Sequence, residues 1–393
     1  MKRLWAFRNT LGVLLASFVS TSPGLAQSEG GWPTAGWKVS TARDQGVDVS
    51  VLDALDQELA SGKHGYVDGM LVVRNGYLVY EKSYSHDYQA LFEGKDPKRW
   101  QYNYYDPDWH PYYKSGPLHT MQSVSKSVTS ALVGIAIRRG EIPGTDIEVS
   151  RYFDAFESTD GDPRWQAIKL RDLLTMTSGI AWDESTVPYT DPRNDCAVME
   201  ASEDWIRYVL GRPMATTPGD RFVYNSGVTV MLAHILFQAT GKHADEYAVE
   251  HLFGPLGIES FYWKKTPTGL VDTEGGLYLT ARDLAKFGYL YLHDGVWDGK
   301  RILPEGWVAA TTAPAVDVSE SDDWKYGFQW WLLPYDTDAY AYTCLGYGGQ
   351  RLLVLPEHDL LAVFTGWNIY DKPALSAAFA LERILEAVTK RRD

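Results

Sequence analysis

The pattern of apolar residues divides this chain into strand-like ends and a helical middle. Near the start, two short apolar runs at 70–73 and 77–80 are separated by Asn75-Gly76, a strong signal for a tight β-hairpin turn. Apolar runs of strand length return at about 326–333, 341–346, 350–355 and 360–366. The sequence therefore predicts an α/β fold, with an antiparallel sheet built from both chain ends and flanked by helices, and an inserted, mainly helical lobe.

The expected helices are placed by the spacing of apolar side chains and by capping residues. Ser50 is expected to cap a first helix with apolar positions 51, 52, 55 and 59. Thr280 is expected to cap a helix that runs to Leu292, and Trp307 falls in another short one. The remaining expected helices cover 123–139, 170–176, 202–210, 226–240, 243–253 and about 373–388. The sheet lobe would then take about 38–118 and 276–393, and the helical lobe about 119–275.

The first 26 residues have the composition of a secretion signal. Three basic residues precede position 9, an apolar run spans 11–19, and residues 24–26 offer small side chains for cleavage. The apolar run is too short for a stable membrane span. We therefore expect an exported protein, periplasmic or secreted, whose mature domain covers 27–393; an uncleaved membrane anchor is the alternative.

Composition narrows the classes of partner and cofactor. The formal net charge is −14, from 37 basic and 51 acidic residues, which disfavours binding to nucleic acid. The two cysteines, Cys196 and Cys344, either form one disulfide or remain buried thiols. The sequence has neither a cysteine-histidine cluster with zinc spacing nor HExxH, so we expect no metal and no other cofactor.

The first candidate for catalysis lies where a polar stretch runs into an expected helix, within residues 119–137. The apolar spacing puts Ser123 at the helix N-terminus and Lys126 one turn further along the same face. The helix end favours a serine alkoxide, and an unprotonated lysine could take the serine proton. That role requires the lysine pKa to fall by about 3 units, through burial or neighbouring positive charge. Because S-x-x-K occurs about once by chance in such a chain, a solvated surface lysine is the alternative.

Two further segments suit a site for acyl transfer. Tyr224 directly precedes an expected helix, where its phenol can relay a proton; a buried core tyrosine is the alternative. Asn225 or Ser226 is expected to hydrogen-bond substrate or to hold Lys126. Residues 345–351 place glycines within a strand, which indicates either close approach of a substrate or a plain bulge. A backbone N–H there, with that of Ser123, would form an oxyanion hole.

Residues 85–118 form a long segment without visible periodicity, rich in Tyr, Trp, Pro and Asp. Such a segment is either a functional loop that walls a pocket or a surface loop whose aromatic side chains pack on the body. The aromatic residues that would wall the pocket are Trp100, Tyr104, Tyr105, Trp109 and Tyr112.

These motifs, in this order, resemble the signatures of the serine β-lactamase and penicillin-recognising family, particularly its class C-like branch. They are Ser123-x-x-Lys126, Tyr224 and the glycine-containing strand at 347–349. Residues 173–179 and 275–284 are also similar, so the resemblance spans nearly all of the mature chain. Within that branch the chain looks most like the 6-aminohexanoate-dimer hydrolases, through residues 178–182, 329–331 and 349–350, and it is also similar to family carboxylesterases.

The resemblance implies a role for each candidate residue. Ser123 would be the nucleophile, Lys126 the general base and Tyr224 the proton shuttle. Gln350 would support the oxyanion through its backbone N–H. The other residues implied in oxyanion support or substrate binding are Gly349, Tyr347, Ser226, Trp182 and Trp331.

Two departures from the family bear on the substrate. The class C motif Tyr-x-Asn reads Tyr224-Asn225-Ser226 here. Tyr347 stands where that class has a lysine, so the cation that would hold a β-lactam carboxylate is missing unless Arg351 faces the cleft.

The expected function is therefore that of an exported serine hydrolase, which cleaves small esters or amides through an acyl-enzyme. A β-lactamase or D-alanyl-D-alanine peptidase, acting on β-lactam or peptide substrates, is the alternative within the same chemistry. A catalytically inactive sensor module with the same fold is the alternative from another class. An α/β-hydrolase is disfavoured because G-x-S-x-G does not occur.

Overall fold

The structure is a computed structural model, which describes residues 31–92, 117–156, 161–189, 191–318, 323–369 and 374–389. Its strands are β1 (Lys38–Val39), β2 (Val67–Arg74), β3 (Tyr77–Ser83), β4 (His119–Thr120), β5 (Tyr262–Trp263), β6 (Leu277–Leu279), β7 (Val296–Trp297), β8 (Lys300–Arg301), β9 (Val316–Asp317), β10 (Lys325–Tyr326), β11 (Trp331–Asp336), β12 (Ala339–Gly346), β13 (Gln350–Leu355) and β14 (Leu360–Gly366). Its α-helices are α1 (Val49–Ala60), α2 (Tyr88–Phe92), α3 (Val124–Arg138), α4 (Leu170–Leu174), α5 (Asp195–Glu200), α6 (Trp205–Leu210), α7 (Ser226–Thr240), α8 (Ala244–Ala248), α9 (Gly254–Leu256), α10 (Ala281–Leu292), α11 (Trp307–Thr311) and α12 (Ala377–Thr389).

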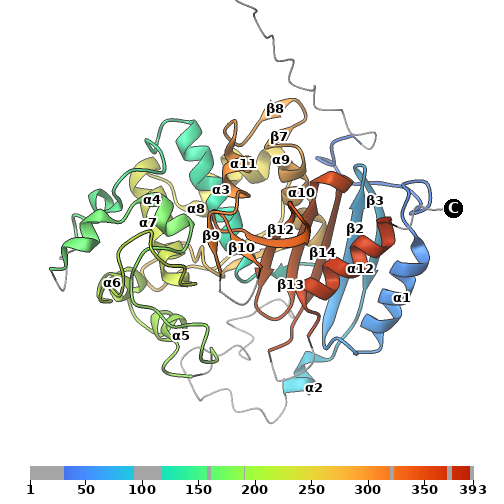
Figure 1. Cartoon of the computed structure of the whole chain (residues 1–393), viewed down its shortest axis with the longest axis horizontal. Coiled ribbons are helices and arrows are strands. Elements are labelled where there is room, and N and C mark those ends of the chain that lie inside the picture. The colour runs from blue at the N-terminus through green and yellow to red at the C-terminus, as the bar shows by residue number, and fades with distance from the viewer. Residues whose placement is uncertain are drawn as a thin grey trace, which may run out of the picture.

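Within the described residues, the large sheet has nine strands in the order β1-β3-β2-β14-β13-β12-β11-β10-β9 (Figure 1). Strands β2 and β14, from opposite ends of the chain, are antiparallel neighbours in its middle. The predicted hairpin is present: Asn75 and Gly76 have φ values of 51° and 78°, as a type I′ turn requires. The prediction of an α/β fold with one sheet built from both chain ends is confirmed.

Helices cover both faces of this sheet. In β13, Leu352 and Val354 belong to the core shared with α3 and α10, whereas Leu353 and Leu355 belong to the core beneath α1 and α12. This alternation is the two-residue period of a strand buried on both sides. At Gly288 of α10, a Cβ atom would come within 2.7 Å of Leu352, so the missing side chain lets the helix lie close to the sheet.

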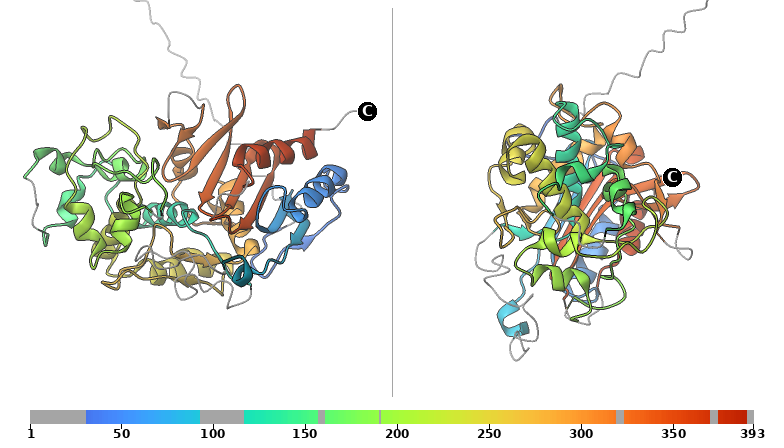
Figure 2. Two further views of the ribbon diagram at one scale, coloured as in Figure 1. Left: turned by 90° about the horizontal axis from the view of Figure 1, so that it is seen from below. Right: turned by 90° about the vertical axis from the view of Figure 1, so that its left-hand side faces the viewer.

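The inserted helical part lies beside this sheet, and α3 runs between them (Figures 1 and 2). Helix α3 packs against α7 and α8 on one side and against β12 and β13 on the other. Gln329 braces this junction, because its backbone O accepts from Ser127 of α3 and its side chain bonds Thr229 of α7. Its amide group also donates to the backbone carbonyls at the end of α4.

Several element boundaries differ from the prediction. The cap of α1 is Asp48, whose carboxylate accepts from Ser50 N–H, rather than Ser50 itself. Helix α5 was not predicted; Asn194 caps it through two backbone N–H groups. The strand expected at 326–333 is two strands, because Gln329 has φ 62° and a Cβ at Gly327 would meet Thr311 O at 1.9 Å. Helix α6 begins three residues later than expected, behind its cap Asp204.

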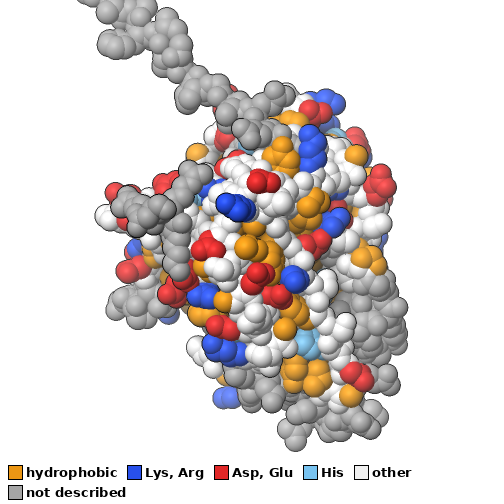
Figure 3. All heavy atoms as spheres, turned by 90° about the vertical axis from the view of Figure 1, so that its right-hand side faces the viewer, with side chains coloured by type: hydrophobic (Ala, Val, Ile, Leu, Met, Phe, Trp, Pro, Cys, Tyr) orange, Lys and Arg blue, Asp and Glu red, His pale blue; other side chains and the backbone are white. Residues whose placement is uncertain are grey.

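The remaining predictions concern the termini, the cysteines and the surface. The proposed signal sequence and the aromatic residues between 100 and 112 lie outside the described residues. Cys196 and Cys344 are buried free thiols, the second of the two expected alternatives. Among the described residues, no helix has the length and apolar character that a membrane span needs. On the right-hand side of the molecule, acidic and basic side chains are interspersed rather than gathered by sign (Figure 3).

Candidate active site

Ser123 lies at the N-terminus of α3, where the chain makes a sharp turn into the helix. The preceding residue, Gln122, has φ 49°, a conformation that costs energy for a residue with a side chain. Ser123 occupies the N-cap position, but its hydroxyl makes no capping bond to the helix backbone. The hydroxyl is therefore directed to other side chains while the helix end still offers its partial positive charge.

Lys126 is buried with its ammonium group beside the Ser123 hydroxyl. Its Nζ donates to Ser123 Oγ at 3.1 Å, to the Glu274 backbone O at 2.8 Å and to Glu274 Oε2 at 3.1 Å. Only 1% of Lys126 is exposed, and Glu274 is 5% exposed. The structure thus brings the predicted serine and lysine together, and adds a carboxylate that the sequence did not indicate.

The charge state of Lys126 is opposite to the one expected from the sequence. Burial by itself lowers the pKa of Lys126, but attraction to Tyr224, Glu274 and Glu184 outweighs burial and raises it above its ordinary value. The expected fall in this pKa is wrong for the resting protein, since the neighbours of the lysine are acidic rather than basic. In this state Lys126 is an ammonium ion.

Tyr224 completes a cluster with these two side chains. The centre of its ring lies 5.2 Å from Lys126 Nζ. Burial raises the pKa of Tyr224, and the charge of Lys126 and the neighbouring Ser123 hydroxyl partly oppose that rise. The three residues proposed from the sequence to act together are therefore neighbours in space.

Glu184 forms a second buried acidic centre near Lys126 and Tyr224. Its carboxylate accepts from the backbone N–H and hydroxyl of Ser226, both at 2.8 Å, from Trp182 Nε1 at 2.6 Å and from Tyr189 OH at 3.1 Å. Burial raises the pKa of Glu184, although the nearby Lys126 lowers it. Ser226 thus anchors Glu184 rather than Lys126, so Ser226 does not fill one of the two roles expected for Asn225 or Ser226.

The glycine-containing segment forms a tight connection between β12 and β13. A Cβ at Gly346 would meet the Met121 backbone O at 2.3 Å, so this turn lies against the segment that leads into Ser123. Gly349 has φ 120° and donates to Gly346 O, while the ring of Tyr347 contacts Tyr189 at 5.1 Å.

Gln350 holds this turn in place through hydrogen bonds from its side chain to backbone groups. Its fully buried amide donates to the backbone O of Gly366 at 2.6 Å and of Tyr347 at 3.0 Å, and accepts from Gly366 N–H. Its side chain is therefore a structural support, and its oxyanion role through the N–H stays a prediction. The adjacent Arg351 faces α12 instead, donating to Leu375 O at 2.6 Å. The guanidinium does not replace the missing cation.

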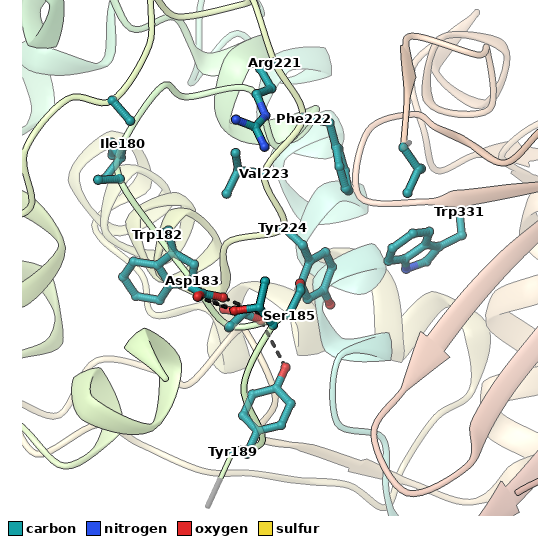
Figure 4. A pocket seen from close by; sticks show the side chains of 15 residues that line it. Ile180, Trp182, Asp183, Ser185, Tyr189, Arg221, Phe222, Val223, Tyr224 and Trp331 are labelled. Atoms are coloured by element: carbon teal, nitrogen blue, oxygen red, sulfur yellow. Dashed lines mark hydrogen bonds between the residues drawn. The ribbon is translucent and has the colours of Figure 1, made fainter. Parts of the chain in front are cut away.

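A pocket of about 730 Å³ opens beside Tyr224 (Figure 4). Tyr224 and Trp331 lie next to each other on one side, with ring centres 5.5 Å apart, and Trp182 lies on the other. The other lining residues are Ile180, Ala181, Asp183, Glu184, Ser185, Thr186, Tyr189, Ala215, Arg221, Phe222, Val223 and Val318. The lining is largely apolar and aromatic, with three charged residues, as is typical of small-molecule sites.

One group of buried side chains has the residue types of a metal site. Ligand atoms of Cys196, Glu200 and Glu274 lie within 4.8 Å of one another. The Glu274 carboxylate, however, already pairs with the ammonium of Lys126 at 3.1 Å. A bound cation would have to share that carboxylate with Lys126, so the arrangement fits an ion pair better than a metal.

The arrangement matches a known family. A family model described as Beta-lactamase matches residues 53–366. The chain belongs to the beta-lactamase family. Together with its hydrolase relatives, this makes it a serine hydrolase, and the resemblance inferred from the motifs is confirmed.

Several proteins of known name are similar to this chain. A 6-aminohexanoate-dimer hydrolase from Paenarthrobacter ureafaciens is 28% identical over 277 residues, which cover 64% of this chain and 68% of that protein. A Bacillus anthracis structure provisionally named a 6-aminohexanoate-dimer hydrolase has a TM-score of 0.65 at 22% identity, covering 86% of this chain and 81% of that one. A D-stereospecific amidohydrolase from a Streptomyces species has a TM-score of 0.60 at 16% identity, covering 87% and 99%. The two structures show a shared fold.

Sequence reasoning missed the buried acids of this beta-lactamase family site. Glu274 directly precedes the 275–284 motif, and Glu184 lies two residues after the 178–182 segment. Glu200 ends α5, the helix that was not predicted. The available signal was an acidic residue beside an otherwise apolar or glycine-rich motif, which indicates a buried partner.

Proposed function

We propose that this beta-lactamase family member cleaves small ester or amide bonds through an acyl-enzyme on Ser123. The observation that carries the proposal is the hydrogen bond from Lys126 Nζ to the Ser123 hydroxyl, at 3.1 Å, with the Tyr224 ring centre 5.2 Å from the same Nζ. A nucleophile, an amine and a phenol in one cluster can supply the attack and the proton transfers of acyl transfer. The intact set also argues against an inactive sensor module.

In the proposed reaction, Ser123 Oγ attacks the carbonyl carbon while Lys126, in its neutral form, takes the hydroxyl proton. Tyr224 passes that proton to the leaving oxygen or nitrogen, and the acyl group stays on Ser123. Water then attacks the ester by the reverse proton path, which frees the acid. The backbone N–H groups of Ser123 and Gln350 are proposed to hold the oxyanion, each worth about 2.7–4 kcal/mol in comparable sites.

Small acyl substrates without a β-lactam ring are favoured over β-lactams. Tyr347 takes the place of the lysine that would bind a β-lactam carboxylate, and Arg351 points toward α12. The largely apolar pocket beside Tyr224 suits an uncharged acyl chain. The relative from Paenarthrobacter ureafaciens, named for hydrolysis of a 6-aminohexanoate dimer, supports an amide among the candidate substrates.

We also propose that the protein is exported, on the basis of the composition of residues 1–26 alone. The basic start, short apolar run and small residues at 24–26 support removal of a signal sequence during secretion. Fractionation of cells that express the full chain, with N-terminal sequencing of the product, tests this. A mature protein that begins near residue 27 outside the cytoplasm is expected; an intact N-terminus inside the cell would contradict it.

A substrate panel tests the proposed class. We expect wild-type protein to hydrolyse short-chain p-nitrophenyl esters and a 6-aminohexanoate dimer faster than a chromogenic cephalosporin, with Ser123→Ala inactive on all three. Faster turnover of the cephalosporin would favour the β-lactamase alternative. Equal rates for the wild type and Ser123→Ala would remove the hydrolase proposal.

A further inference from the structure

The ammonium group of Lys126 lies in a buried environment dominated by acids from several elements. Glu274 reaches it from the loop before β6, Tyr224 from the segment before α7, and Glu184 from the loop at 180–189. The other titratable or charged groups that act on this environment are Cys196 and Glu200 from α5, and Asp272 and Lys264 from the β5–β6 connection. Because most of these groups are acidic, the charge of the site depends on which of them hold a proton.

The geometry at Lys126 is that of an ammonium donor rather than a base. An ammonium has three protons, and each has an acceptor here: Ser123 Oγ, the Glu274 backbone O and Glu274 Oε2. The proton aimed at Ser123 must be replaced by a lone pair before Lys126 can accept the serine proton. Because Lys126 is 1% exposed, solvent has little access to remove it.

We propose that Glu274 is the immediate proton acceptor of Lys126, so that this buried pair converts from a charged to a neutral form when the lysine acts as a base. This inference rests on the proposed acyl-enzyme function and names a residue that acts through Lys126. Glu274 Oε2 lies 3.1 Å from Nζ, close enough for direct transfer. The conversion removes two buried charges at once, which limits its cost in a poorly solvated site.

The proton balance of the step closes within the protein. One Nζ–H bond of Lys126 breaks and an Oε2–H bond forms on Glu274, which leaves a neutral amine and a neutral carboxylic acid. The amine keeps one N–H for the Glu274 backbone O and turns its lone pair to Ser123 Oγ. It then takes the Ser123 proton as Oγ bonds to the carbonyl carbon, and Tyr224 delivers that proton to the leaving group. Glu274 returns its proton to Lys126 when the cycle ends.

Glu200 supplies a second reason for assigning Glu274 this role. Oxygen atoms of these two buried carboxyl groups lie within 4.8 Å of each other. Burial raises the pKa of Glu200 well above its ordinary value, and the neighbouring Glu274 adds to that rise. Two adjacent carboxyl groups affect each other's affinity for a proton, so Glu200 influences how strongly Glu274 binds one. Glu274 is thus a neighbour of Glu200 as well as of Lys126.

The test is the pH dependence of kcat/KM for a p-nitrophenyl ester between pH 7 and 9, in wild type and Glu274→Gln. Internal transfer leaves the number of bound protons unchanged, so the wild-type profile is expected to be flat. In Glu274→Gln the side-chain oxygen still accepts from Lys126 but cannot take its proton. We expect a loss of roughly 100-fold or more at pH 7, and a rise toward tenfold per pH unit as Lys126 loses its proton to solvent.

A matched control is Asp172→Asn, which replaces a buried carboxylate in α4 that bonds the Lys169 backbone N–H instead of the candidate site. Its profile should follow the wild type. A Glu274→Gln rate within threefold of wild type, or above it, would overturn the inference. So would a slow variant with a flat profile, since Glu274 would then only hold Lys126 in place. If Glu274→Gln does not fold, the wild-type profile alone tests the inference. A flat profile supports it, whereas a tenfold rise per pH unit would contradict it, because Lys126 would then release its proton to solvent.

Failure of the inference is distinguishable from failure of the proposed function. A fluorophosphonate adduct on Ser123, measured by mass spectrometry in the same wild-type preparation, reports on the nucleophile alone. With the adduct present and Glu274→Gln unaffected, only the role of Glu274 is lost. If no adduct forms on Ser123, the acyl-enzyme proposal is contradicted, and so is the inference about Glu274 that rests on it.

Discussion

The hydroxyl of Ser123 lies 3.1 Å from Nζ of Lys126 and makes no capping bond to the helix that both residues share. A serine at this position would ordinarily satisfy a free N–H of the first turn. Here that stabilisation is given up, and the positive φ of the preceding Gln122 adds a further cost. Both costs are consistent with a residue placed for chemistry rather than for stability.

Lys126→Met should lower both activity and stability. Loss of the base is expected to reduce kcat/KM by roughly 10²–10⁴-fold. Removal of the ammonium leaves Glu274 buried without its ion-pair partner, which should cost about 3–5 kcal/mol in the free energy of unfolding. Ester hydrolysis and urea denaturation measure the two effects.

The double variant Lys126→Met/Glu274→Gln separates these effects. Since no unpaired charge remains, most of the lost stability should return while activity stays low. Lys169→Met, at a partly exposed lysine outside the candidate site, should change neither quantity beyond about 0.5 kcal/mol or threefold. A double variant as unstable as Lys126→Met would contradict the buried ion pair.

Tyr224→Phe tests the proton shuttle. The phenol neighbours Ser123, so its removal should lower kcat/KM by roughly 100-fold while the aromatic wall of the pocket is kept. Steady-state kinetics with one ester at several concentrations measures this. Tyr335→Phe removes a hydroxyl that bonds the exposed Glu357, and it should behave as wild type. Equal activity of Tyr224→Phe and Tyr335→Phe would exclude a role for the phenol.

Glu200→Gln should be more stable than the wild type, by a margin that grows as pH rises. The folded-state pKa of Glu200 is raised by burial, so the stabilising contribution of this group is complete below about pH 4.3 and is lost as pH rises toward the folded pKa. Within that window the wild type loses about 1.4 kcal/mol per pH unit from this group, whereas glutamine loses nothing. Urea denaturation at pH 5, 6 and 7 should show a growing advantage for the variant, and a constant or shrinking difference would contradict a buried, protonated Glu200.

Trp331→Ala should change acyl-chain preference. The indole forms one side of the pocket next to Tyr224, so its loss makes room for longer chains. We expect the ratio of kcat/KM for octanoyl over acetyl p-nitrophenyl esters to rise by roughly tenfold or more. Trp324 contacts Trp331 but does not line the pocket, so Trp324→Ala is the control. A ratio that changes equally in both variants would place the acyl chain elsewhere.

Much of the fold could be predicted from local sequence pattern. The Asn75-Gly76 turn, the strands β13 and β14 and helix α7 were placed correctly because apolar period and turn chemistry act over a few residues. The break between β10 and β11 was missed, since it depends on contact between Gly327 and Thr311. The same limit applied to the site: Ser123, Lys126 and Tyr224 follow from motifs, whereas the charges around Lys126 come from distant segments.

Arg351 and Ser226 show why side-chain roles needed the structure. Strand alternation left the direction of Arg351 open until the face occupied by α12 was known. Ser226 follows the tyrosine motif closely, yet its hydroxyl bonds Glu184, 42 residues earlier in the chain. A pairing over such a distance has no local signature.

The most direct measurement is the mass of the intact protein during turnover of a slowly hydrolysed ester, followed by peptide mapping. An increase equal to one acyl group, located on Ser123 and absent from Ser123→Ala, is predicted. Turnover with no acylated protein on rapid quenching, or an acyl group on another residue, would contradict the account.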